Sequence, residues 1–221
     1  MAGLFYPEGF STSKMLAYYM ERFTTVEINN TFYKLPTEKT LTDWAAAAPP
    51  GFTFTLKAPQ AITRRAQLKD SAELVNVFTS RAALMGPKLG ILLFQLPPWG
   101  KKNLEVFDTF LTWLPQGTRA AFEFRNASWL SDDVFERLKA RNLALCITDS
   151  EKATTPLEAT ADYGYFRLRD EGYTEPEIQA WGDKVAALTS RWKDTYVYFK
   201  HEEAGKGPLF ANVLKRHLGL G

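Results

Sequence analysis

Short runs rich in β-branched and aromatic residues alternate with amphipathic stretches along the chain. The runs that predict strands cover residues 25–29, 52–57, 90–96, 119–125, 143–148, 163–168 and 195–200. Helices are predicted near residues 11–22, 37–48, 71–85, 104–114, 132–141, 175–191 and 207–218. The connection from Thr148 to Tyr163 has no helical pattern, and Pro156 with its polar neighbours indicates a loop there. Strands that alternate with helices predict parallel βαβ units.

Most of these strands carry one polar face. Glu27 and Asn29 share a face of the first strand, and Glu123 and Arg125 share a face of the fourth. Charged side chains are costly to bury against helices, so we expect the aromatic faces to pack on helices and the polar faces to meet one another. An open sheet covered on both faces favours continuous apolar runs instead. The pattern therefore predicts one α/β domain over residues 1–221, a TIM-like (β/α) barrel of seven parallel strands.

Composition and charge exclude several classes of protein. The chain has 221 residues, of which 45% are hydrophobic, and a formal net charge of +2. This is typical of a globular protein, and it lacks the clustered basic excess of general DNA-binding proteins. The single Cys146 cannot form an internal disulfide, which fits a reducing cytoplasm. With no signal-type N-terminus and no run of about 18 apolar residues, we expect a cytoplasmic protein without a membrane partner.

Polar side chains gather at the predicted carboxyl ends of the strands, where barrel enzymes place their sites. The set consists of Glu27, Asn29, Lys57, Gln95, Glu123, Arg125, Asp149, Arg167, Arg169 and Lys200. Arg64, in the loop after the second strand, adds a further cation. Arginine binds carboxylate or phosphate with two hydrogen bonds, so the cations predict a pocket for an anionic ligand. Buried ion pairs that hold the barrel together are the alternative interpretation.

The carboxylates suggest catalysis at the same place. Glu27 and Glu123, with Asp149, are candidates for general acid and base, a role that requires their pKa values to differ. The alternative pairs Glu27 with Lys57 and Glu123 with an arginine. A divalent ion held by His201 and these carboxylates is a weaker hypothesis, and with no metal-binding or nucleotide-binding motif in the sequence we expect no metal and no cofactor.

Aromatic residues follow several strands, where site loops belong. They are Phe32, Tyr33, Trp99, Trp129 and Tyr173. Their rings can stack on a sugar or a base, and we include Trp129 among the candidate ligand-binding residues. Closure of the top of the barrel is the other interpretation. Cys146 is expected on the helix-facing side of its strand, as a packing thiol.

Several segments together resemble the YecE-like family, the domain-of-unknown-function family number seventy-two. The matching runs are FYPEG at 5–9, TVEINNTFYKLP at 25–36, KAP at 57–59, FQLPP at 94–98, EFR at 123–125 with SW at 128–129, and YVYF at 196–199. The resemblance covers essentially the whole chain and implies a TIM-barrel-like fold, but it implies no settled reaction.

Two departures from that family change the expectation. Family members usually begin with a further strand that carries a Gly-Trp-Ser-Tyr-like segment, so the resemblance implies a shortened start or a seven-stranded barrel with an open edge. The family also often has histidine where this chain has Arg64, Asn126 and Arg169, and an asparagine pair at Lys200 and His201. Chemistry that needs imidazole at those positions is therefore not expected here.

Three functional classes remain. The first is an enzyme that acts on an anionic or phosphorylated small molecule by acid–base chemistry at the barrel mouth. The second is a non-catalytic protein that binds nucleic acid or another polyanion. The third is a shortened relative whose polar core is structural. The interleaved carboxylates favour the first, because a polyanion binder has little use for them. An open strand edge also predicts self-association.

Overall fold

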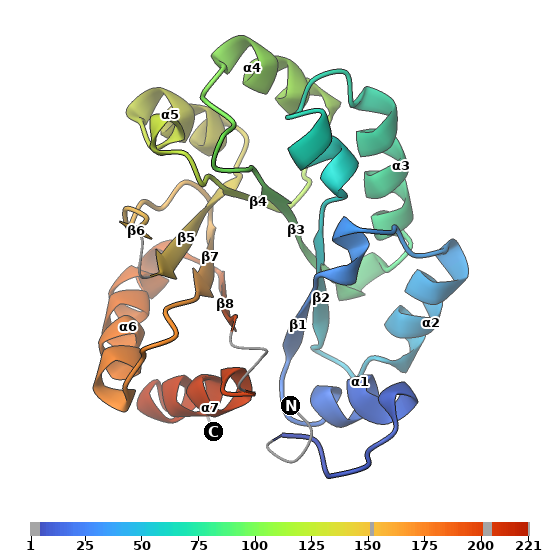
Figure 1. The fold of residues 1–221 in the computed structure, drawn as a ribbon, viewed down its shortest axis with the longest axis vertical. Helices are drawn as coiled ribbons and strands as arrows, with labels where there is room; N and C mark the ends of the chain where they lie inside the picture. The colour runs from blue at the N-terminus through green and yellow to red at the C-terminus, as the bar shows by residue number, and fades with distance from the viewer. Residues whose placement is uncertain (1–4, 151–152, 201–204, 221) are drawn as a thin grey trace.

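The strands form a nearly closed barrel in the computed structural model, which describes residues 5–150, 153–200 and 205–220 (Figure 1). The seven parallel strands are β1 (Thr25–Ile28), β2 (Thr53–Lys57), β3 (Leu89–Gln95), β4 (Ala120–Glu123), β5 (Ala144–Ser150), β7 (Tyr163–Leu168) and β8 (Asp194–Phe199). They are hydrogen-bonded in that order, each to the next. The predicted α/β fold with seven parallel strands is confirmed.

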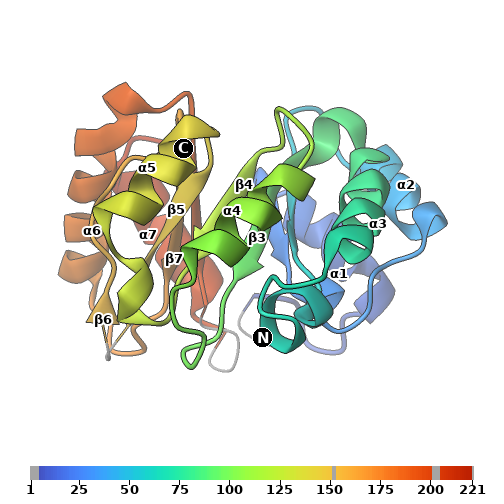
Figure 2. The same ribbon diagram turned by 90° about the horizontal axis from the view of Figure 1, so that it is seen from above.

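Helices cover the outside of this sheet (Figures 1 and 2). They are α1 (Thr12–Met20), α2 (Glu38–Ala47), α3 (Ala72–Ala83), α4 (Leu104–Trp113), α5 (Asp132–Ala140), α6 (Glu175–Leu188) and α7 (Gly207–His217). Local sequence sets their starts, since the Thr37 hydroxyl accepts a hydrogen bond from the Thr40 amide at 3.2 Å and Thr174 with Glu177 forms a capping box. No helix in the described parts of the chain is long and apolar enough to cross a membrane.

Short elements lie in the loops between the strands. They are the 3₁₀ turns η1 (Asn30–Phe32), η3 (Gly86–Lys88), η4 (Ala127–Trp129) and η5 (Thr189–Arg191), and the π-helical turn η2 (Ala61–Arg65). The connection between β5 and β7 has no helix among its described residues, as expected. It contains β6 (Ala153–Thr154), which the sequence did not predict and which pairs antiparallel with β5.

Aromatic side chains fill the layer between the sheet and the helices. Phe94 on β3 stacks on Phe122 on β4, with ring centroids 5.3 Å apart. Phe107 and Phe110 of α4 contact these rings edge-on. All four side chains are buried, so the prediction that the aromatic faces of these strands meet the helices is confirmed.

The interior of the barrel is apolar and phenolic toward the amino ends of the strands. One buried cluster there joins small and aliphatic residues to the tyrosines of β7 and β8: Ile91, Leu93, Ala121, Ala144, Cys146, Tyr163, Tyr165, Tyr196 and Tyr198. The expectation that Cys146 faces the helices is therefore wrong. Residues 143–147 are apolar at every position, so the sequence gives no indication of which face of β5 is internal.

The ring of strands is open at one place. Among the described residues no hydrogen-bonded ladder joins β1 to β8, the two ends of the sheet order. Side chains cross this seam instead: the Thr25 hydroxyl lies 2.7 Å from the phenolic oxygen of Tyr198, which is also 2.9 Å from the Thr55 hydroxyl.

Candidate functional site at the mouth of the barrel

A buried ion-pair network occupies the barrel interior just above the tyrosines. Arg167 donates from Nε and Nη2 to the two carboxylate oxygens of Glu27, at 2.9 and 2.8 Å, and from Nη1 to Glu123. The side chains of Glu27, Glu123 and Arg167 are between 1% and 3% exposed. Tyr165 donates to Glu27 at 2.6 Å and Gln95 donates to Glu123 at 2.8 Å. Each buried charge is thus paired, as its burial requires.

The network keeps both carboxylates ionised. Burial by itself raises the pKa of Glu27 and Glu123, but the charge of Arg167 opposes it and leaves the pKa of each below its ordinary value. A general acid must hold a proton near the working pH, and these groups do not. The geometry therefore matches the alternative interpretation, with one change: Glu27 pairs with Arg167 rather than with Lys57.

Asp149 does not join the other two carboxylates. It accepts hydrogen bonds from the Tyr173 hydroxyl at 2.7 Å and from the indole nitrogen of Trp181 in α6 at 3.1 Å. This places its side chain between the sheet and α6, not inside the barrel, so its expected placement with Glu27 and Glu123 is wrong. The cause is the alternation of β5, in which Cys146 faces inward and position 149 outward.

A pocket of about 350 Å³ opens at the mouth, beside the carboxyl ends of β2, β3 and β4. Its lining combines cations and aromatic rings: Phe32, Tyr33, Lys57, Arg64, Gln95, Leu96, Pro97, Pro98, Trp99 and Arg125. No carboxylate belongs to this lining. Tyr33 is 75% exposed and Trp99 is 54% exposed, so both rings present open faces to solvent. Four of the candidate site residues line this pocket, namely Lys57, Arg64, Gln95 and Arg125. Of the aromatic candidates, Tyr33 and Trp99 are exposed at its edge.

Lys57 lines this pocket without an anionic partner. Its Nζ lies 4.2 Å from the centroid of the Phe32 ring, and it has no hydrogen bond or ion pair among the described residues. Burial, together with the nearby charges of Arg167 and Arg125, lowers the pKa of Lys57 to about 8, and the charges of Glu123 and Glu27 oppose this shift only in part. The sequence did not predict this shift, because it depends on side chains from three other strands.

Arg125 and Arg169, at the mouth, each face Glu123 with only one of their guanidinium nitrogens. Arg125 Nε donates to Glu123 at 2.8 Å, and Arg169 Nη1 lies 3.6 Å from the same carboxylate. Each of these two side chains is 34% exposed. Arg64 is exposed, and its guanidinium lies 5.1 Å from the Trp99 ring centroid. Glu123 thus orients two arginines by one edge of each guanidinium.

The loop that carries Arg64 has an unusual backbone. Arg64 belongs to the π-helical turn η2, and Gln67, Leu68 and Asp70 then follow with φ of 48°, 71° and 43°. Left-handed backbone is costly for a residue such as Leu68, and both this strain and π-helical turns are frequent at functional sites. Leu68 is fully buried, so packing holds the strained turn in place.

Trp129 has a structural position instead of a ligand-binding one. It is 3% exposed, its ring stacks on Phe124 with centroids 4.9 Å apart, and its indole nitrogen donates to the Gly100 carbonyl at 2.8 Å. The prediction that Trp129 faces a ligand is wrong, because the ring closes the layer between β4 and the loop before α4. That hydrogen bond also fixes the turn that presents Trp99.

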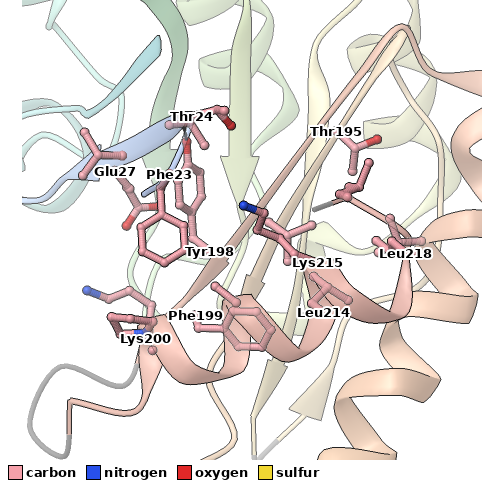
Figure 3. Close-up of a pocket in the computed structure, with 18 of the residues that line it drawn as sticks. Phe23, Thr24, Glu27, Thr195, Tyr198, Phe199, Lys200, Leu214, Lys215 and Leu218 are labelled. Atoms are coloured by element: carbon pink, nitrogen blue, oxygen red, sulfur yellow. Dashed lines mark hydrogen bonds between the residues drawn. The ribbon is translucent and has the colours of Figure 1, made fainter. Parts of the chain in front are cut away.

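Asn29 and Lys200 line a different cavity. It has a volume of about 360 Å³, lies along the open seam between β1, β8 and α7, and is mostly apolar (Figure 3). Glu27 and Lys200 lie at one end of it in this view, and Thr195 and Leu218 at the other. The candidate cations therefore do not all line one pocket: Lys57 and Arg125 line the mouth, Arg167 is buried in the ion-pair network, and Lys200 lines the seam cavity.

Metal binding has no geometric support in the described part of the chain. No group of three or more histidine, cysteine, aspartate or glutamate side chains there is placed to hold an ion. His201, the imidazole of the weaker metal hypothesis, lies outside the described residues.

Comparison with known proteins gives a consistent result. The family model described as protein of unknown function DUF72 matches residues 1–221. The UPF0759 protein YunF of Bacillus subtilis is 26% identical over 90% of this chain and 85% of its own length. The UPF0759 protein YecE of Escherichia coli K12 is 30% identical over 57% of this chain and 46% of its own length.

Solved structures agree with the fold. A DUF72 family protein from Thermotoga maritima superposes with a TM-score of 0.88 at 27% identity, over 99% of this chain and 94% of that one. A DUF72 family protein from Enterococcus faecalis superposes with a TM-score of 0.83 at 21% identity, over 96% of each chain. None of these descriptions names a reaction or a ligand.

Proposed function

The chain belongs to the DUF72 family, and from the mouth of its barrel we propose that it binds a small molecule carrying a phosphate or carboxylate group and a flat ring or sugar face. One observation carries this proposal. Lys57, Arg64 and Arg125 line a pocket that no carboxylate lines, and the exposed rings of Tyr33 and Trp99 flank it.

The charges of the pocket favour an anion. Lys57 has no counter-charge of its own among the described residues, and neither has Arg64. Arg125 is anchored at Nε by Glu123, which leaves its terminal nitrogens for a ligand. Arginine binds phosphate or carboxylate through paired N–H groups, and lysine adds a point charge. The rings of Tyr33 and Trp99 supply stacking surface for the uncharged part of the ligand.

The carboxylates support this site from below. Glu27 and Glu123 both form ion pairs with Arg167, and Glu123 also forms ion pairs with Arg125 and Arg169. We therefore propose a binding pocket above a structural ion-pair network, in place of acid–base catalysis by these two groups. A pocket of about 350 Å³ suits a small ligand better than a polymer.

Titration calorimetry with inorganic phosphate and with phenyl phosphate tests the proposal. We expect phenyl phosphate to bind more tightly, because it adds a ring to the same anion. Arg64→Ala should weaken both by about tenfold, as one charge-assisted hydrogen bond is lost. Arg65→Ala is the matched control, since Arg65 is the exposed neighbour that does not line the pocket. Absence of binding, or equal loss in both variants, would overturn the proposal.

A further inference from the structure

Lys57 differs from the lysines that form ion pairs on the surface. Lys39 and Lys102 illustrate the usual arrangement, in which the ammonium group forms an ion pair with Asp43 or Asp133. Lys57 instead is half-buried at the end of β2, where its Nζ rests against the face of Phe32. The two carboxylates whose charges act on Lys57, Glu27 and Glu123, are already paired with Arg167.

Its surroundings raise the fraction of neutral amine. Arg125 and Arg167 repel a proton on Lys57, and partial burial removes the water that would solvate the charge. A pKa of about 8 leaves roughly one amine in ten unprotonated at pH 7, compared with fewer than about one in a thousand for an ordinary lysine. Desolvated lysines beside other cations are a recurrent source of nucleophilic amines.

We propose that Lys57 captures the carbonyl group of an anionic aldehyde or ketone as a reversible imine. The inference rests on the proposed function, because Arg64 and Arg125 would hold the anionic group while Nζ attacks. All three side chains line the same pocket. The ligand class is thereby narrowed to carbonyl compounds that carry a phosphate or carboxylate group.

The step conserves atoms and electrons. The lone pair of the neutral Lys57 amine attacks the carbonyl carbon, the C–N bond forms, and the carbonyl π electrons move to oxygen. Proton transfer from nitrogen to oxygen gives a carbinolamine. Its hydroxyl group leaves as water with a second proton from nitrogen, and the C=N bond of the imine results. No oxidant or reductant takes part, and Arg125, one of the two cations that hold the ligand, also disfavours a proton on the attacking amine.

Pyridoxal 5′-phosphate is a suitable probe, because it joins an aldehyde, a flat ring and a phosphate. Pyridoxal, which lacks the phosphate, is its matched partner. The intact protein is incubated with each probe at pH 7.5, the imine is reduced with borohydride, and the labelled lysine is identified by peptide mass mapping. Lys57→Arg and Lys57→Met remove the reactive amine. Lys34→Arg is the control, since Lys34 is exposed and follows the pocket residue Tyr33.

We expect pyridoxal 5′-phosphate to label Lys57 at least about tenfold more than any other lysine, to do so in Lys34→Arg, and to be displaced by inorganic phosphate. The rate of labelling should rise through pH 8. Uniform labelling of the lysines would overturn the inference. If phosphate binds by calorimetry and Lys57 stays unlabelled, the inference fails and the binding site stands. If pyridoxal labels Lys57 equally well, the reactive amine stands and the anion site fails.

Discussion

Arg167 on β7 binds both carboxylate oxygens of Glu27 on β1, at 2.9 and 2.8 Å. These two strands are not neighbours in the sheet, because β8 follows β7 and the order ends there. The ion pair therefore crosses the interior and joins β1, at one end of the open sheet, to β7, the strand next to the other end. Glu27 therefore helps to connect β1 to the far side of the sheet, whereas neighbouring strands elsewhere are connected by backbone hydrogen bonds.

Replacing Glu27 by Gln should destabilise the protein by about 3 kcal/mol, because Arg167 then stays buried with half of its counter-charge removed. The measurement is the midpoint of urea unfolding. Glu8→Gln, at an exposed position, is the control and should leave the midpoint unchanged. An unchanged midpoint for Glu27→Gln would instead favour a carboxylate kept for chemistry.

Acid should weaken the fold through the same network. The pKa values of Glu27 and Glu123 are lower in the folded protein than in the unfolded chain, where they lie near 4.5. Their contribution to stability is therefore complete above about pH 4.5 and is lost as the pH falls toward the folded values. Melting temperatures measured from pH 7 to pH 3 should fall more steeply for the wild type than for Glu123→Gln. Parallel curves would contradict this assignment.

Lys57→Met should stabilise the protein at pH 7 by about 1 kcal/mol, because a desolvated cation beside two arginines is removed. The folded pKa of about 8 lies below the unfolded value of 10.5, so the wild type bears the cost of charging Lys57 in full below pH 8. That cost disappears as the pH rises toward 10.5, and the difference between the proteins should shrink with it. Urea unfolding at pH 7 and pH 9.5 measures the difference, and Lys34→Met serves as the exposed control. A less stable Lys57→Met would show that contacts of the alkyl chain outweigh its charge.

Salt separates a small-ligand pocket from a polyanion surface. Phenyl phosphate contacts few cations, so its affinity should change by less than about tenfold between 50 and 200 mM salt. A protein that binds nucleic acid through six or more phosphates loses about a thousandfold over the same range. Fluorescence anisotropy with a labelled single-stranded oligonucleotide gives the comparison. Tight, strongly salt-dependent binding of the oligonucleotide would favour the polyanion alternative.

The sequence predicts the fold better than the site, for a physical reason. Alternation of polar and aromatic residues in β4 and β7 shows which face of each strand is internal, and there the placement of Glu123 and Arg167 is correct. β5 has no such alternation, so Cys146 and Asp149 exchange faces relative to the prediction. Pairing depends on distances between strands far apart in sequence. Glu27 could be assigned to the interior, but its choice of Arg167 over Lys57 could not.

The open seam gives the barrel a preferred place to separate. Between every other neighbouring pair of strands, backbone hydrogen bonds must break together, whereas β1 and β8 are connected only through side chains such as Thr25 and Tyr198 in the described residues. Motions that separate β1 from β8 leave the backbone hydrogen bonds between the other strands intact. Backbone amides at the outer edge of β1 should then exchange hydrogen by local opening, at a rate set by the ion pair between Glu27 and Arg167. Amides of the central strands should exchange only when the whole protein unfolds.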